Sequence, residues 1–115
     1  MKIVYLGILY KEKLNEQKNS WYKQLSEALM QVPSVRKTNA KYHELYMKGR
    51  VGIAKITIKG KSLYVYLAVD PSKYTATKYG IKDVSTIKSH ANYRAECKVT
   101  SNRKLKYLIE IIKEF

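Results

Sequence analysis

Two tyrosines alternate with aliphatic residues in a segment that also carries lysines. Tyr64 and Tyr66 fall between Leu63, Val65 and Leu67. Neighbouring side chains of a strand point to opposite faces, so aliphatic residues in the core turn both tyrosines outward, beside Lys55 and Thr57 of the preceding strand. Unpaired bases stack on aromatic rings while phosphates bind Lys and Arg, so the pattern predicts a nucleic-acid platform. The alternative is that Tyr, which favours strands, half-covers a solvated sheet.

Basic residues are concentrated on two predicted hairpin turns, Lys48-Gly49-Arg50 and Lys59-Gly60-Lys61. From Arg36 to Lys61 the chain has eight Lys or Arg and a single acid, Glu44. We expect Lys48, Arg50, Lys59 and Lys61 to form one electropositive end of the sheet. Such an end would bind phosphates with steep salt dependence and no sequence preference. Turns that are merely solvated are the alternative.

A third candidate is the start of the last predicted helix, Ser101-Asn102-Arg103-Lys104. Backbone N–H groups at a helix N-terminus attract anions, and Arg103 and Lys104 would add charge to a phosphate held there. Cations in a first helical turn oppose the helix dipole. Their presence therefore favours an anion nearby, although a solvated helix start would also fit.

One catalytic pattern occurs, that of a metal-dependent nuclease. Asp83 is followed by Glu96-Cys97-Lys98, and in such enzymes two carboxylates hold a divalent ion while a Lys activates water. The pattern is short and common by chance. The two histidines, His43 and His90, and the lone Cys97 do not make a zinc set, so we expect no metal and no cofactor. Cys97 falls on the apolar side of its strand and is expected in the core.

The elements that must position these residues follow from hydrophobic periodicity. Ile3 to Tyr10 predicts a strand, and a helix capped by Asn19 or Ser20 and containing Trp21 is expected to end before Pro33. Period-two patterns between residues 35 and 69 predict a three-stranded antiparallel meander. A long polar connection follows over residues 72–89, with a short helical turn near residues 86–88, and then a strand from residue 93 and a helix capped by Thr100 or Ser101.

This order predicts one α+β domain over residues 1–115. We expect an antiparallel sheet of about five strands with two helices on one face, in the order β-α-β-β-β-loop-β-α. A chain of 115 residues with 45% hydrophobic residues suits a single core.

The composition is strongly basic, with 23 Lys and Arg against 9 Asp and Glu and a formal net charge of +14. Such an excess speeds encounters with anionic polymers. An AT-rich genome would also raise Lys and Tyr, but it usually raises Glu as well. The apolar run from Ile3 to Leu9 is too short for a signal peptide or a membrane span, and one cysteine suits a reducing compartment. We therefore expect a cytoplasmic protein with no membrane partner.

The second half of the chain resembles a group of uncharacterised small bacterial α+β domains of unknown function, over roughly Gly49 to Ile109. The residues that carry the likeness are Lys48-Gly49-Arg50, Ala54-Lys55-Ile56, Ile58-Lys59-Gly60-Lys61-Ser62-Leu63, Tyr66-Leu67-Ala68-Val69-Asp70-Pro71, Lys78-Tyr79, Asp83-Val84-Ser85 and the run from Lys98 to Tyr107. The resemblance implies the fold given above and no activity. Members of the group do not carry an acid at the position of Glu96, which weakens the nuclease pattern.

Together these features predict a non-enzymatic nucleic-acid-binding domain. Its expected contacts are Tyr64, Tyr66, Lys55, Lys48, Arg50, Lys59, Lys61, Arg103 and Lys104. One alternative is a basic interaction module, or a phage or mobile-element inhibitor, that docks on an acidic or nucleic-acid-binding protein surface. The metal-dependent nuclease is a remote alternative.

Overall fold

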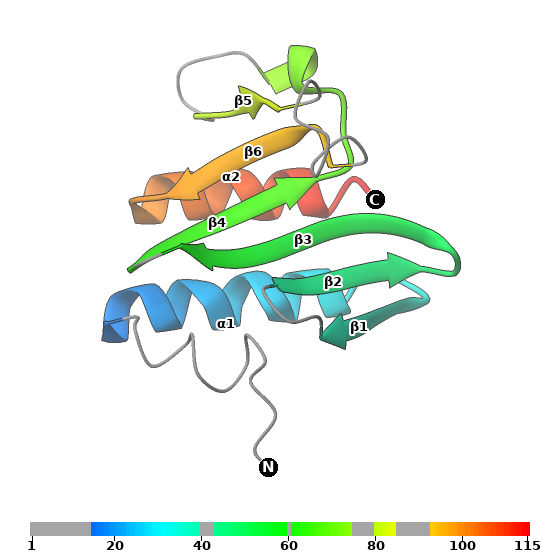
Figure 1. The fold of residues 1–115 in the computed structure, drawn as a ribbon, viewed down its shortest axis with the longest axis horizontal. Helices are drawn as coiled ribbons and strands as arrows, with labels where there is room; N and C mark the ends of the chain where they lie inside the picture. The colour runs from blue at the N-terminus through cyan, green and yellow to red at the C-terminus, as the bar shows by residue number, and fades with distance from the viewer. Residues whose placement is uncertain (1–14, 40–42, 60, 75–79, 85–92) are drawn as a thin grey trace.

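The computed structural model describes residues 15–39, 43–59, 61–74, 80–84 and 93–115. These residues form two α-helices, six strands and one short 3-10 helix (Figure 1). In chain order the elements are α1 (Glu16–Met30), β1 (Val35–Asn39), β2 (His43–Lys48), β3 (Val51–Lys59), β4 (Ser62–Leu67), η3 (Pro71–Tyr74), β5 (Lys82–Asp83), β6 (Ala95–Val99) and α2 (Asn102–Ile112). The predicted strand over residues 3–10 and the helical turn near residues 86–88 lie outside the described residues.

The six strands form one antiparallel sheet in the order β1-β2-β3-β4-β6-β5, and both helices pack on the same face of it (Figure 1). The expected α+β class is confirmed. Two of the six strands, β1 and β5, were not expected. β1 is five residues long with mostly polar side chains, and β5 has two residues. Hydrophobic periodicity cannot detect a strand without alternating apolar residues or one of two residues, and such strands are stabilised by pairing with a neighbour.

The core lies between the two helices and the sheet face that they cover. α1 contributes Leu25 and Leu29, and α2 contributes Leu108 and Ile112, all essentially inaccessible to solvent. The sheet side is made by alternate residues of the central strands, namely Ala54, Ile56, Ile58, Leu63, Val65, Leu67, Ala95, Cys97 and Val99. Fully burying one such aliphatic side chain contributes about 1.5–3 kcal/mol. The period-two pattern is therefore the main sequence signal for this face.

Each helix begins at a side-chain cap. The Asn15 side chain accepts a hydrogen bond from the Lys18 backbone N–H at 2.8 Å, so α1 starts earlier than the expected cap at Asn19 or Ser20. The expected cap of α2 is confirmed, since Ser101 Oγ accepts from the Lys104 backbone N–H at 3.2 Å. In the described part of the chain, neither helix combines the length and apolar character that a membrane span requires.

Candidate nucleic-acid interface

Tyr64, Tyr66 and the lysines of β3 lie on the sheet face opposite the helices, which we call the outer face. Antiparallel pairing places Lys55 beside Tyr66, and Thr57 beside Tyr64. On the other side of β4, Tyr66 pairs with Glu96 and Tyr64 with Lys98. Residues paired in this way project to the same side of a sheet. The strand pleat thus brings tyrosines and lysines together as the sequence predicted.

The expectation that both tyrosines meet solvent is wrong for Tyr66. Its exposed fraction is 0%, and that of its neighbour Lys55 is 5%. The Lys55 ammonium nitrogen lies 4.8 Å from the centroid of the Tyr66 ring and 5.5 Å from that of Tyr93. Burial, and next the nearby charge of Lys59, lower the pKa of Lys55. Tyr66 and Lys55 are therefore both buried, and Tyr66 offers no ring for stacking.

Tyr64, by contrast, is only half-buried and has a cation near its ring from each neighbouring strand. The Lys59 ammonium nitrogen lies 4.8 Å from the ring centroid, and that of Lys98 lies 5.9 Å from it. Both lysines are exposed. Distances within about 6 Å are those of cation–π contacts. Tyr64 is thus an accessible ring flanked by two exposed positive charges.

Lys59 is also held by a hydrogen bond, since its ammonium group donates to the Tyr66 hydroxyl at 2.8 Å. The same hydroxyl interacts with the Glu96 side chain on the neighbouring strand. Burial, and next the Glu96 hydrogen bond, raise the pKa of Tyr66, which keeps this phenol protonated at neutral pH. Buried Tyr66 therefore positions the exposed Lys59 beside Tyr64.

The two basic turns lie at opposite ends of the sheet, so the expectation that they form one electropositive end is wrong. Lys48 and Arg50 lie at the β2–β3 turn, where Gly49 has a φ of 64°, while Lys59 and Lys61 flank the β3–β4 turn. β3 has nine residues, so the turns are separated by about 26 Å. Successive hairpin turns of an antiparallel meander necessarily alternate between the two ends of the sheet.

The β3–β4 turn lies at the same end of the molecule as the starts of both helices (Figure 1). The Lys18 ammonium group of α1 donates to the Lys61 backbone carbonyl at 2.8 Å. The Trp21 indole N–H of α1 donates to Asn102 Oδ1 of α2 at 2.6 Å. These contacts hold together three segments that are far apart in the sequence.

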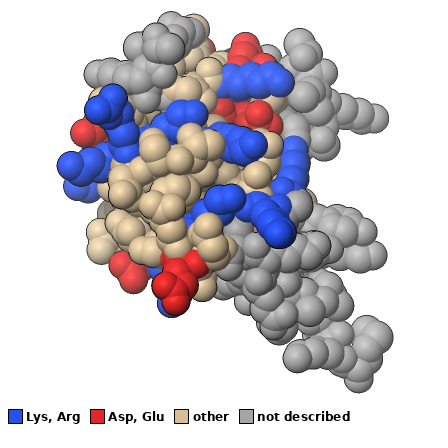
Figure 2. Space-filling view, turned by 90° about the vertical axis from the view of Figure 1, so that its left-hand side faces the viewer, with Lys and Arg blue, Asp and Glu red and all other residues tan. Residues whose placement is uncertain are grey.

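We call this end of the molecule the basic end, and define it by its cations Lys18, Lys59, Lys61, Lys98 and Arg103 with the ring of Tyr64. Pairing of Leu63 with Val99 brings the start of α2, and with it Arg103, next to the first residues of β4. Figure 2, which looks onto this end, shows several Lys and Arg side chains across it, with fewer Asp and Glu side chains among and around them. Of the two expected cations of α2, Arg103 is exposed, whereas half-buried Lys104 lies against Gly80.

Sequence reasoning missed two of these cations, Lys18 and Lys98. Lys18 precedes the helix start that the sequence suggested, so nothing connected it with Lys61. Lys98 was noted only for the nuclease pattern, although it alternates with Cys97 in a strand next to the tyrosines. The order of strands in the sheet, which places β6 beside β4, is the information that was lacking.

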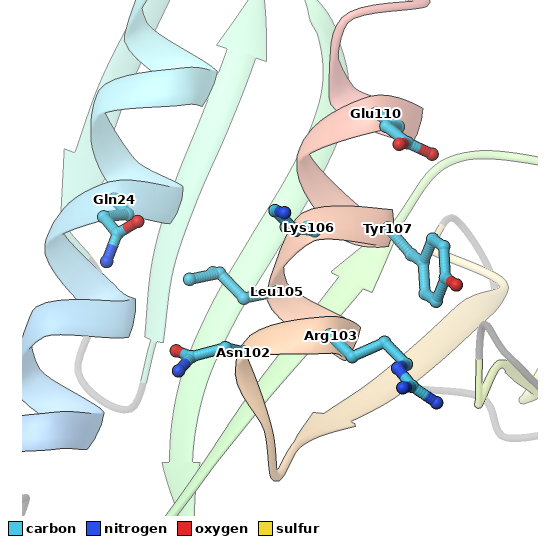
Figure 3. A pocket seen from close by; sticks show the side chains of 7 residues that line it. All are labelled: Gln24, Asn102, Arg103, Leu105, Lys106, Tyr107 and Glu110. Carbon is cyan, nitrogen blue, oxygen red and sulfur yellow. The ribbon is translucent and has the colours of Figure 1, made fainter.

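A groove of about 640 Å³ lies beside α2 and faces α1 across part of its length (Figure 3). Its lining residues are Gln24, Asn102, Arg103, Leu105, Lys106, Tyr107 and Glu110. Gln24 stands on α1 opposite Leu105, whereas Tyr107 and Arg103 point away from α1 (Figure 3). Arg103 belongs to both the groove and the basic end. The groove thus adjoins the basic end at Arg103 and carries Lys106 and Glu110 further along α2.

The residues of the nuclease pattern are not brought together by the strands. Asp83 pairs with Ala95, whose side chain is in the core, while Glu96 pairs with Lys82 and projects to the outer face beside Tyr66. Neighbouring positions of a strand point to opposite sides, so the two carboxylates diverge. Within the described ranges, no cluster of three or more His, Cys, Asp or Glu could hold a metal ion.

Cys97 is buried in the core, as its position in the strand predicted. Burial raises the pKa of its thiol to about 11; of the smaller effects, the Lys104 charge lowers this pKa and the Glu96 charge raises it. A thiol with so high a pKa is a poor nucleophile at neutral pH. His43 lies half-buried in β2, where burial and then the Lys55 charge lower its pKa. His90 lies outside the described residues.

Comparison with models of known protein families, with curated proteins and with solved structures gives no match for this chain. The resemblance described for residues 49–109 therefore stays a sequence-based expectation. The case for a function depends on the basic end itself.

Proposed function

We propose that this chain is a non-enzymatic nucleic-acid-binding domain that contacts its ligand with the basic end. The observation that supports the proposal is that five cations from separate segments lie at one end of the molecule, two of them beside the half-buried ring of Tyr64. Lys18 comes from α1, Lys59 and Lys61 from the β3–β4 hairpin, Lys98 from β6 and Arg103 from α2.

Gathering like charges on one end of a small domain costs free energy through mutual repulsion. A chain of phosphates relieves that repulsion, and it gains further free energy by releasing its condensed counterions. The overall charge of +14 strengthens this attraction at longer range. A polyanion is therefore the ligand that the charge arrangement favours.

Nucleic acid is favoured over other polyanions because the basic end contains an aromatic ring. Lys59 and Lys98 lie within cation–π distance of Tyr64, which is half-buried and thus retains exposed surface. A ring between cations matches a ligand that presents flat bases between phosphates. Simple polyphosphates would use the charges and leave the ring without a role.

The experiment measures fluorescence anisotropy of labelled oligonucleotides at about 50 and 200 mM salt, a range over which phosphate contacts strongly affect affinity. We expect wild-type affinity to fall steeply between the two. Each phosphate contact contributes a slope of about −0.7 to −0.9 in log affinity against log salt, so Lys59→Gln with Lys61→Gln should make the slope shallower by about one to two.

A matched control uses the turn at the other end of the sheet. Lys48→Gln with Arg50→Gln removes the same charge from the same kind of hairpin turn, and it should change the salt slope much less. If both double variants weaken binding equally, overall charge rather than the basic end is responsible. If the wild-type protein binds no oligonucleotide at low salt, the proposed function is wrong.

A further inference from the structure

We infer that the basic end is selective for single-stranded nucleic acid, with one unpaired base stacked on Tyr64 and the neighbouring phosphates bound by Lys59 and Lys98. This inference rests on the proposed function and names its substrate class. The aromatic rings at this end of the molecule lie in different environments.

Tyr64 is a half-buried ring at this end with Lys59 and Lys98 within cation–π distance. Tyr66 is wholly buried, and Trp21 is 3% exposed with its indole N–H bonded to Asn102. Each base that stacks on a protein ring needs an accessible π-face. The geometry therefore supports one stacked base, where the sequence had suggested a platform of two tyrosines.

The two flanking lysines differ in how firmly they are held. Lys59 contacts Tyr64 and also donates to the Tyr66 hydroxyl at 2.8 Å, while Lys98 approaches Tyr64 less closely, at 5.9 Å from the ring centroid. A base that approaches the ring must displace at least one exposed lysine from its cation–π contact, which is weak at an exposed site. The displaced ammonium group then becomes available to a phosphate beside the stacked base.

A duplex cannot use Tyr64 in this way because its bases are already stacked on one another. The ring lies in β4, which is paired on one side with β3 and on the other with β6, so it sits on a continuous sheet surface. Reading duplex bases requires an element that enters a groove. Tyr64 offers a surface instead, and a duplex would interact with the cations alone.

The test compares a fluorescein-labelled single strand with a hairpin duplex of the same sequence, at one low salt concentration. Wild-type protein should prefer the single strand. Tyr64→Thr keeps strand propensity and removes the ring, and it should weaken single-strand binding by about five- to 150-fold while duplex affinity stays within twofold. Tyr64→Phe should bind like the wild type, because it retains the ring.

Tyr74→Thr serves as a control, since Tyr74 is another partly exposed tyrosine and lies in η3, after the far end of β4. It should leave both affinities unchanged. A second measurement needs no variant: a single strand carrying iodouridine, irradiated in complex with wild-type protein, should crosslink to Tyr64. Circular dichroism of each variant checks that the fold is retained.

Equal affinity for both ligands, an equal loss of both on Tyr64→Thr, or crosslinks confined to other residues would overturn the inference and leave the proposed function standing. Absence of wild-type binding to either ligand would overturn both. A loss restricted to the single strand, with a crosslink on Tyr64, would support both.

Discussion

The Lys59 ammonium group donates a hydrogen bond to the Tyr66 hydroxyl at 2.8 Å, so a buried tyrosine holds an exposed cation in place. The two residues lie on paired strands, β3 and β4, and Lys59 also contacts the ring of Tyr64. The two tyrosines of β4 therefore have different roles. Tyr66 belongs to the packed framework, and Tyr64 to the surface that we propose binds nucleic acid.

Tyr66→Phe should therefore affect stability more than binding. The change removes the hydroxyl that interacts with Lys59 and Glu96, and we expect a loss of about 1–3 kcal/mol in the free energy of unfolding because charged partners are involved. Urea denaturation followed by the fluorescence of the single tryptophan measures it. Oligonucleotide affinity should fall less than on Tyr64→Thr. A larger loss of affinity at position 66 would mean that Tyr66 contacts the ligand.

Tyr22→Phe should destabilise the protein through a buried carboxylate. Glu44 is 1% exposed, and its Oε1 accepts a hydrogen bond from the Tyr22 hydroxyl at 2.5 Å. The Tyr46 hydroxyl lies 3.2 Å from the same oxygen. Weakening the hydrogen bonding of a buried charged group costs about 1–3 kcal/mol, which urea denaturation would detect.

The matched control for Tyr22 is Tyr74→Phe, which removes an exposed hydrogen bond to Glu114 of 2.6 Å. Exposed substitutions of this kind change stability by no more than about 0.5 kcal/mol. If Tyr22→Phe and Tyr74→Phe reduced the free energy of unfolding by similar amounts, the prediction that the burial of Glu44 determines the loss would be contradicted.

Stability should fall as the pH rises above 9, in part because of Cys97. Burial raises the pKa of this thiol from 9.0 to about 11, so between these values the unfolded chain loses the proton while the folded chain keeps it. The stability that the protonated thiol contributes is fully present below pH 9 and is lost as the pH approaches 11. Over this range the free energy of unfolding falls by at most about 1.4 kcal/mol per pH unit because of Cys97.

The measurement compares urea denaturation of the wild type and Cys97→Ala at several pH values from 8 to 10. The variant is less stable throughout because it leaves a small cavity, but its stability should decline less steeply with pH. Parallel pH profiles for the two proteins would show that the thiol does not contribute to alkaline unfolding.

Gly52→Ala should be destabilising because the tyrosine of position 93 packs against this glycine. A Cβ on Gly52 would lie 2.0 Å from the Tyr93 hydroxyl oxygen and 2.7 Å from the carbon that bears it. Relieving such an overlap costs about 1–3 kcal/mol. The cost should be smaller by at least about 1 kcal/mol when Tyr93→Leu is also present, as measured in a double-mutant cycle. Additive effects would contradict a direct clash.

Several parts of the fold could be predicted from local patterns. The alternation of Leu63, Val65 and Leu67 with Tyr64 and Tyr66 indicated which side chains share a face, and the register of β3, β4 and β6 agrees. Ser101 as the cap of α2 and Cys97 in the core were also predicted correctly. Each of these features depends on residues close together in the chain.

The candidate site depended on information that is not local. The sequence indicated a basic, tyrosine-bearing strand but placed Lys48 and Arg50 beside Lys59 and Lys61, at what proved to be opposite ends of β3. It also treated Tyr66 as exposed, whereas this side chain is fully buried, with Lys55 and Lys59 near its ring.

The amino-acid sequence by itself determined the strong positive charge, the strand pleat and the helical periodicity, because these follow from composition and from backbone geometry over a few residues. The tertiary structure decided which cations meet and which tyrosine stays accessible. Strand order, and the packing of α1 and α2 on one face, bring Lys18, Lys61 and Arg103 to one end. Such arrangements arise from contacts between distant segments, which a local pattern does not encode.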